Sequence, residues 1–173
     1  MRVFGIDCGT QFTGFGVVET TAAGKLQAIA SGAIRLLKKE PLPQRLCMVF
    51  TELTALMAQH QPDVVAIEEV FHAANSRTAL MLGQVRGVAL LAAATSKLEI
   101  AEYAPLAVKS AVSGYGLADK QQVQFMVMRL LELTVAPEPL DASDALAIAI
   151  CHIHHAQTRA AQERGPESRK DTR

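Results

Sequence analysis

The chain has 173 residues, which is the size of one domain and leaves no room for two large lobes. Half of its residues are hydrophobic and only 20% are charged, a composition that excludes a disordered chain. Seventeen Lys and Arg balance seventeen Asp and Glu, so the chain as a whole is not a strongly basic, nucleic-acid-coating protein, although a local basic patch remains compatible with the sequence.

Residues 3–6 form a short, continuous apolar run, which is typical of a strand buried on both faces. A Gly-Thr turn at 9–10 leads to a second predicted strand at 13–18. Alternating and branched residues predict a third strand at 26–36, after which Pro41 and Pro43 break the pattern.

The rest of the chain alternates helices with strands. Apolar residues spaced four, three and four apart predict a helix over 46–60, and 64–67 has the pattern of a second buried strand. The further expected elements are a helix at 75–97, a strand at 99–103, a helix opening at Pro105, and helices at 119–133 and 141–155. This order predicts an α/β fold with a mixed five-stranded sheet covered by helices on both faces.

The last residues differ in composition from the rest of the chain. Residues 157–173 hold five Lys and Arg against three Asp and Glu, without a large apolar side chain. We therefore expect one domain over residues 1–156, followed by a basic, flexible tail over 157–173.

The sequence also predicts the compartment of the protein. No uninterrupted apolar run approaches the roughly 18 residues that a membrane-spanning helix needs. Asp7 stands where a secretory signal would still be apolar. The three cysteines are odd in number and lack CxxC spacing, which is typical of free thiols in a reducing cytoplasm. We expect a cytoplasmic protein without a membrane segment.

Two of the predicted strands run directly into an acidic residue. Asp7 follows the first apolar run and Glu68 follows the run at 64–67. If these strands are parallel neighbours, their carboxyl ends meet at one edge of the sheet, which is where open α/β sheets bind ligands. Each acid alone is also compatible with an ordinary polar strand end.

Asp141 and Asp144 add a second pair of acids at the start of the last predicted helix. Their spacing of three places both carboxylates on one face of a helical turn, where the helix dipole favours anions. Capping explains one acid at such a position but not two, and the apolar helix that follows must be buried.

Four carboxylates brought together repel one another, by about 4 kcal/mol for each pair at 4 Å and an effective dielectric near 20. Such a cluster needs cations, and hard oxygen donors select Mg²⁺ or Mn²⁺. Two such ions about 3.5–4 Å apart clamp the attacking and leaving oxygens of a phosphodiester. The histidines do not suggest zinc, because His152, His154 and His155 are expected to be solvated or to complement the helix dipole.

Six blocks of the sequence resemble the RuvC family of Holliday-junction resolvases, in order and with similar spacing from about residue 2 to residue 155. They are GIDCGT at 5–10 with TGFGV at 13–17, AIEEVF at 66–71, LGQVRG at 82–87, VK at 108–109, ADK at 118–120 and DASDALAIA at 141–149.

The resemblance implies a ribonuclease-H-like fold and a homodimer that cleaves two symmetric strands of a four-way DNA junction. It implies that Asp7, Glu68, Asp141 and Asp144 are the catalytic acids and hold two Mg²⁺ per subunit, with Mn²⁺ as a substitute. It also implies docking with a branch-migration complex of the RuvA and RuvB type.

Further residues acquire expected roles from the same resemblance. Lys109 and Lys120 match lysines near the scissile phosphate, and Phe71 matches an aromatic that stacks on a base at the junction centre. The alternatives are solvated helix charge for the lysines and a core side chain for Phe71. Arg77 and Arg86 are expected to join both lysines in a basic DNA groove.

The sequence departs from the family pattern in two places. Cys8 stands where proline is common, and nothing nearby in the sequence suggests a reactive thiol. Glu69 stands where a neutral amide is familiar and, as the next strand residue, should point away from Glu68.

Three other functions remain compatible with the sequence. GIDCGT at 5–10 also resembles the phosphate loop of actin-like ATPases, although those proteins need two lobes and this chain has one. A junction-binding protein without chemistry is disfavoured, because a cluster of acids repels the DNA backbone. A related nuclease acting on other branched DNA would use the same metal chemistry.

Overall fold

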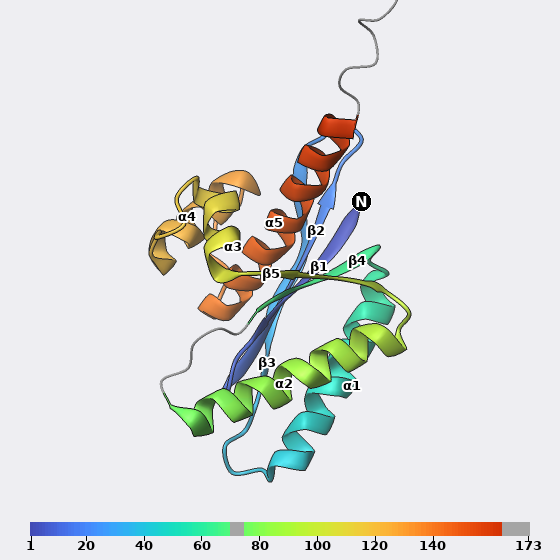
Figure 1. Ribbon diagram of the computed structural model, residues 1–173, viewed down its shortest axis with the longest axis vertical. Coiled ribbons are helices and arrows are strands. Elements are labelled where there is room, and N and C mark those ends of the chain that lie inside the picture. The colour runs from blue at the N-terminus through green and yellow to red at the C-terminus, as the bar shows by residue number, and fades with distance from the viewer. Residues whose placement is uncertain (70–74, 164–173) are drawn as a thin grey trace, which may run out of the picture.

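The computed structural model describes residues 1–69 and 75–163, and it is built around a five-stranded sheet (Figure 1). The strands, in spatial order, are β3 (Leu26–Arg35), β2 (Phe12–Thr20), β1 (Arg2–Cys8), β4 (Val64–Glu68) and β5 (Glu99–Tyr103). The first three strands along the chain form an antiparallel meander, whereas β4 pairs parallel with both β1 and β5. The expected mixed sheet is confirmed.

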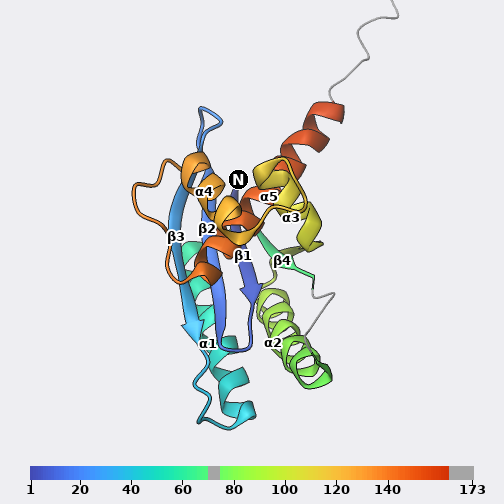
Figure 2. The same cartoon turned by 90° about the vertical axis from the view of Figure 1, so that its left-hand side faces the viewer.

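Helices cover both faces of this sheet, as expected, and the element order is the one the sequence predicts. On one face lie α1 (Leu42–His60) and α2 (Ser76–Thr95). The other face carries α3 (Pro105–Ser113), α4 (Lys120–Leu130) and α5 (Leu140–Glu163). Figures 1 and 2 show α3 and α4 beside α5, on the side of the sheet away from α1 and α2.

The start of α5 lies close against β1 and β2 because glycines face it. A Cβ atom on Gly5 would collide with the carbonyl oxygen of Ala145, and one on Gly14 would collide with the carbonyl oxygen of Asp141. The apolar stripe of α5, which includes Leu146 and Ile150, is buried in the core on this face. The glycines therefore bring the first turn of α5 to the ends of the strands.

The core on the other face contains Phe4, Ile6 and Leu53, with Val85 of α2. Most of the surface of α2 lies outside this core. By length and composition alone, with a mean hydropathy of 1.4, α2 is the one helix in the described ranges apolar enough to cross a membrane. The search for continuous apolar runs in the sequence misses this helix, because arginines divide its apolar residues into shorter runs.

Several element ends differ from the sequence prediction. Helix α1 begins at Leu42 rather than Leu46, because a proline fits the first turn of a helix, where its missing N–H is not needed. Helix α4 ends at Leu130, ahead of Glu132, whose φ of 53° is left-handed. Helix α5 continues to Glu163, so residues 157–163 of the expected flexible tail are helical, and 164–173 lie outside the described residues.

Candidate active site

Asp7 and Glu68 lie at the same edge of the sheet. The parallel register of β1 and β4 pairs Ile6 with Ile67, so the acidic residue after each stands at the carboxyl end of neighbouring strands. Glu68 is itself paired with Tyr103 of β5. The prediction that Asp7 and Glu68 meet at the carboxyl ends of two parallel strands is therefore confirmed.

Asp144 joins these two acids from the first turns of α5. The three carboxylates line one cavity of about 150 Å³ together with Lys109 of α3 and Lys120 of α4. The apolar wall of the cavity is formed by Pro105, Val108, Val123 and Ala147. Five of the six residues expected to act in catalysis thus meet in one place.

Asp141 lies one helical turn before Asp144 and is not among the residues that line the cavity. Its charge nevertheless reaches Asp7, whose pKa it raises. Its Oδ1 also lies near Gly9, in the turn that follows β1. Asp141 therefore borders the site from the side of the β1–β2 turn.

The site carries an excess of negative charge. Burial, followed by the charges of Asp144, Glu68 and Asp141, raises the pKa of Asp7 from 3.8 to about 7, against the opposing charge of Lys120. Burial and the Asp144 charge likewise raise the pKa of Glu68. Neighbouring carboxylates add to the effect of burial on the pKa of both residues, so these acids interact as a cluster.

Lys120 supplies part of the missing positive charge. Its Nζ donates a 2.7 Å hydrogen bond to Oδ2 of Asp144. Burial lowers the pKa of Lys120, but this hydrogen bond and the charges of Asp144, Asp7 and Asp141 outweigh it, so the pKa is raised. The ammonium group is therefore protonated at neutral pH.

The start of α4 holds Lys120 in place. The carboxylate of Asp119 accepts a hydrogen bond from the backbone N–H of Gln122, whose side chain in turn accepts one from the N–H of Asp119. Lys120 is the first residue after this capping box. The cap therefore fixes the direction in which the lysine leaves the helix.

The donor set fits a hard divalent cation. The acids contribute only carboxylate oxygens, which Mg²⁺ and Mn²⁺ prefer, and the excess charge calls for a cation. In the part of the chain that the structure describes, no three His, Cys, Asp or Glu side chains are grouped closely enough to hold an ion as they stand. The Lys120 ammonium pairs with Asp144, and a divalent cation held by these acids would supply further positive charge.

A family model for the crossover junction endodeoxyribonuclease RuvC matches residues 3–152 of this chain. The chain belongs to the RuvC family. The RuvC of Acidobacterium capsulatum is 62% identical over 94% of this chain and 99% of its own length, and that of Koribacter versatilis is 56% identical over 91% and 95%.

Comparison with solved structures also places the chain in the RuvC family. The Thermus thermophilus RuvC structure has a TM-score of 0.83 at 33% identity, over 92% of this chain and 97% of that one. A second structure, of T. thermophilus RuvC in complex with a Holliday junction substrate, also has a TM-score of 0.83, at 30% identity, over 91% of this chain and 96% of that one. The resemblance, the ribonuclease-H-like fold and the enzyme class, a DNA endonuclease, are thereby confirmed.

The residues expected at the DNA are placed differently from one another. Lys109 and Lys120 line the cavity, and Arg77 is exposed in the first turn of α2. Arg86 instead donates to the carbonyl oxygen of Glu68 and pairs with the carboxylate of Glu102. Phe71 lies outside the described residues.

Cys8, the first of the two departures described above, is buried and is not a nucleophile. Burial, followed by the charge of Asp7, raises the pKa of its thiol to about 12, so the thiolate is absent at neutral pH. This agrees with the interpretation made from the sequence. The backbone N–H of Glu69, the other departure, donates to the carbonyl oxygen of Tyr103 at 2.8 Å.

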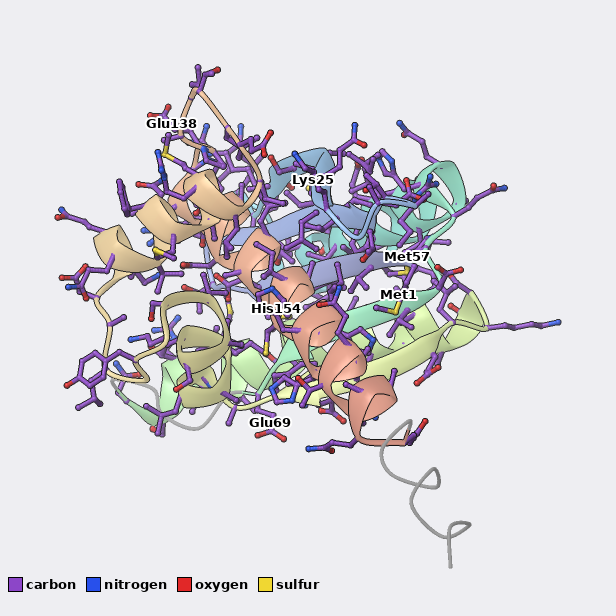
Figure 3. The ribbon with its side chains drawn as sticks, turned by 90° about the horizontal axis from the view of Figure 1, so that it is seen from above. Met1, Lys25, Met57, Glu69, Glu138 and His154 are labelled. Carbon is purple, nitrogen blue, oxygen red and sulfur yellow. The ribbon has the colours of Figure 1, made fainter. Side chains whose placement is uncertain are left out.

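The expectation that the histidines of α5 are solvated is wrong for His152. Its side chain is only 2% exposed and its Nδ1 lies 2.9 Å from the hydroxyl of Tyr103, because this face of α5 packs against the end of β5. His154 contacts the carbonyl oxygen of Ala111 in α3, and Figure 3 shows it on the side of α5 next to that helix. Both histidines are structural contacts between elements.

Proposed function

We propose that this chain resolves four-way DNA junctions by metal-dependent hydrolysis of phosphodiester bonds. The observation that carries this proposal is the meeting of Asp7, Glu68 and Asp144 with two lysines in one cavity, where burial and mutual repulsion raise the pKa of Asp7 to about 7. Together with Asp141, these acids hold two Mg²⁺ ions per subunit, and Mn²⁺ can substitute for them.

In this proposal, the residues that line the cavity have different roles at the scissile phosphate. Two bound Mg²⁺ ions supply activation of a water molecule and neutralisation of the charge that develops on the phosphate. Asp7 and Glu68 at the strand ends, with Asp144 and Asp141 at the start of α5, would hold these cations. Lys120, whose side chain is 64% exposed, turns from Asp144 towards the DNA and stabilises the leaving oxygen. Lys109 adds a second positive charge from α3.

DNA binding extends beyond the cavity. Arg77, exposed at the start of α2, contacts the phosphate backbone in this proposal. Phe71 stacks on a base at the open centre of the junction, a contact that intact duplex does not offer. The proposed partners are junction DNA and a motor complex of the RuvA and RuvB type, and the proposed compartment is the cytoplasm.

The proposal includes a homodimer with α2 in its interface. A junction offers two equivalent strands, so two symmetry-related sites match its geometry. Leu80 and Leu91, on the outer side of α2, are 65% and 54% exposed, and little of this apolar helix is buried. An apolar helix surface of this kind is typical of an interface between subunits.

The test compares a synthetic mobile four-way junction with plain duplex and with a three-way junction, each with and without Mg²⁺. We expect paired, symmetric cuts in the four-way junction only, and only with Mg²⁺. Binding without cleavage in Mg²⁺ or Mn²⁺ would indicate a junction-binding protein instead. Equal cleavage of the three-way junction would indicate a nuclease of wider substrate range.

A further inference from the structure

Arg86 lies behind the metal-binding edge rather than on the surface that faces DNA. It belongs to α2, which packs on the face of the sheet opposite α5 and the acidic cavity (Figure 1). Its Nε donates to the carbonyl oxygen of Glu68 at 3.3 Å, and its guanidinium also pairs with the carboxylate of Glu102. The side chain is 21% exposed.

These two contacts join three elements at one point. Glu68 is the last residue of β4, and Glu102 is the penultimate residue of β5. A guanidinium group offers several N–H donors in a rigid plane, so one arginine can hold a carbonyl and a carboxylate at once. Arg86 therefore links the end of β4 to β5 from the face of the sheet that α2 covers.

We propose that Arg86 is a positioning residue for the metal site: by holding the main chain of Glu68 and the carboxylate of Glu102, it fixes the Glu68 carboxylate for metal binding. The proposal rests on the metal-dependent function above. A metal ligand must be held within about 0.5 Å of its productive position, and Glu68 closes its strand. In this proposal the role replaces the DNA contact expected from the sequence, because Nε and one terminal nitrogen of the guanidinium already donate to protein groups.

The test uses Arg86→Gln, with Arg129→Gln as the matched control. Arg129 is exposed on α4, so the control makes the same chemical change at a site with no link to Glu68. Mn²⁺ is titrated into the DNA-free protein and followed by electron paramagnetic resonance. Junction binding is measured in EDTA, and cleavage is measured under single-turnover conditions over a range of Mg²⁺ concentrations.

We expect Arg86→Gln to weaken Mn²⁺ binding about tenfold and to raise the Mg²⁺ concentration for half-maximal cleavage. Junction affinity in EDTA should stay within about twofold of the wild-type value, and Arg129→Gln should change none of the three quantities. Arg86→Lys should recover part of the loss, because it restores the charge beside Glu102 but not the second contact. Glu102→Gln should shift Mn²⁺ affinity in the same direction and by less.

Unchanged Mn²⁺ affinity in Arg86→Gln with weaker junction binding would overturn the proposal in favour of a DNA contact. If Arg86→Gln does not fold, unchanged Mn²⁺ affinity in Glu102→Gln overturns it equally. A wild-type protein that neither binds Mn²⁺ nor cleaves the junction would instead contradict the proposed function itself.

Discussion

The Nζ atom of Lys120 donates a 2.7 Å hydrogen bond to Oδ2 of Asp144, and so links the capped start of α4 to the first turns of α5. This ion pair places positive charge inside a cluster of acids that repel one another, and Lys109 adds a second positive charge near Glu68. In the proposed mechanism, Lys120 and a bound cation would compete for Asp144, and the lysine would be released towards the DNA when the cation binds.

Lys120→Gln should therefore lower the single-turnover rate of junction cleavage by about 10- to 100-fold, because a positive charge near the leaving oxygen is lost. Junction affinity in EDTA should fall much less, since one phosphate contact among many is removed. Lys25→Gln, at an exposed lysine that pairs with Glu132 at 3.5 Å, is the control and should leave the rate unchanged. A Lys120→Gln rate near that of the control would remove the lysine from the chemistry.

The raised pKa of Asp7 predicts how stability depends on pH in the metal-free protein. The folded state binds the Asp7 proton up to about pH 7, whereas the unfolded chain releases it near the ordinary value of 3.8. The raised pKa of Asp7 therefore contributes to the free energy of unfolding in full below about pH 4. This contribution is lost as the pH rises to about 7. Asp7→Asn should accordingly melt several degrees above the wild-type protein at pH 8 in EDTA.

Melting curves of both proteins between pH 5 and pH 8 check this expectation. The difference between Asp7→Asn and the wild-type protein should grow as the pH rises, and added Mg²⁺ should stabilise only the wild-type protein appreciably at pH 8. A difference that is independent of pH would show that Asp7 does not titrate in this range.

The close approach of α5 to β1 predicts that Gly5→Ala is destabilising. The added Cβ atom would collide with the backbone of Ala145, and overpacking of this kind costs about 1–3 kcal/mol. Gly83→Ala is the matched control, because nothing lies near its added methyl group and alanine favours the helix. Urea unfolding of both variants measures the effect, and equal stabilities would contradict the described packing.

The exposed apolar side of α2 predicts where the dimer forms. Leu91→Glu should shift the protein from dimer to monomer at micromolar concentration, because it buries an unpaired charge in the proposed interface. Leu117→Glu places the same charge at another exposed leucine, which precedes α4, and should leave the dimer intact. Sedimentation velocity distinguishes the two, and a wild-type protein that is only monomeric would exclude the interface.

The sequence predicts those parts of this site that depend on local patterns. Asp7 and Glu68 follow apolar strand runs, and their meeting follows from parallel pairing alone. Asp141 and Asp144 follow from helical spacing. Lys109 and Lys120 are identified only by the six blocks that resemble the RuvC family, because no local spacing pattern predicts that these lysines lie beside the acids.

Contacts between distant elements are the parts that the sequence does not predict. Arg86 and Glu102 belong to a helix and a strand whose packing is decided only by the fold, so the arginine resembles a free basic residue. The burial of His152 against Tyr103 likewise depends on how α5 crosses β5. The extension of α5 beyond residue 155 is missed because polar residues in an exposed helix have no apolar periodicity.

The metal-dependent role of this carboxylate cluster is tested most directly by Asp7→Asn beside the wild-type protein on a mobile four-way junction. Cleavage in Mg²⁺ and binding in EDTA are measured on the same preparations. We expect Asp7→Asn to abolish cleavage while junction binding stays intact or becomes tighter, because a repulsive charge leaves the site and the other DNA contacts remain. Near-normal turnover of Asp7→Asn in Mg²⁺ would contradict the assignment of this carboxylate cluster as the metal-dependent catalytic centre.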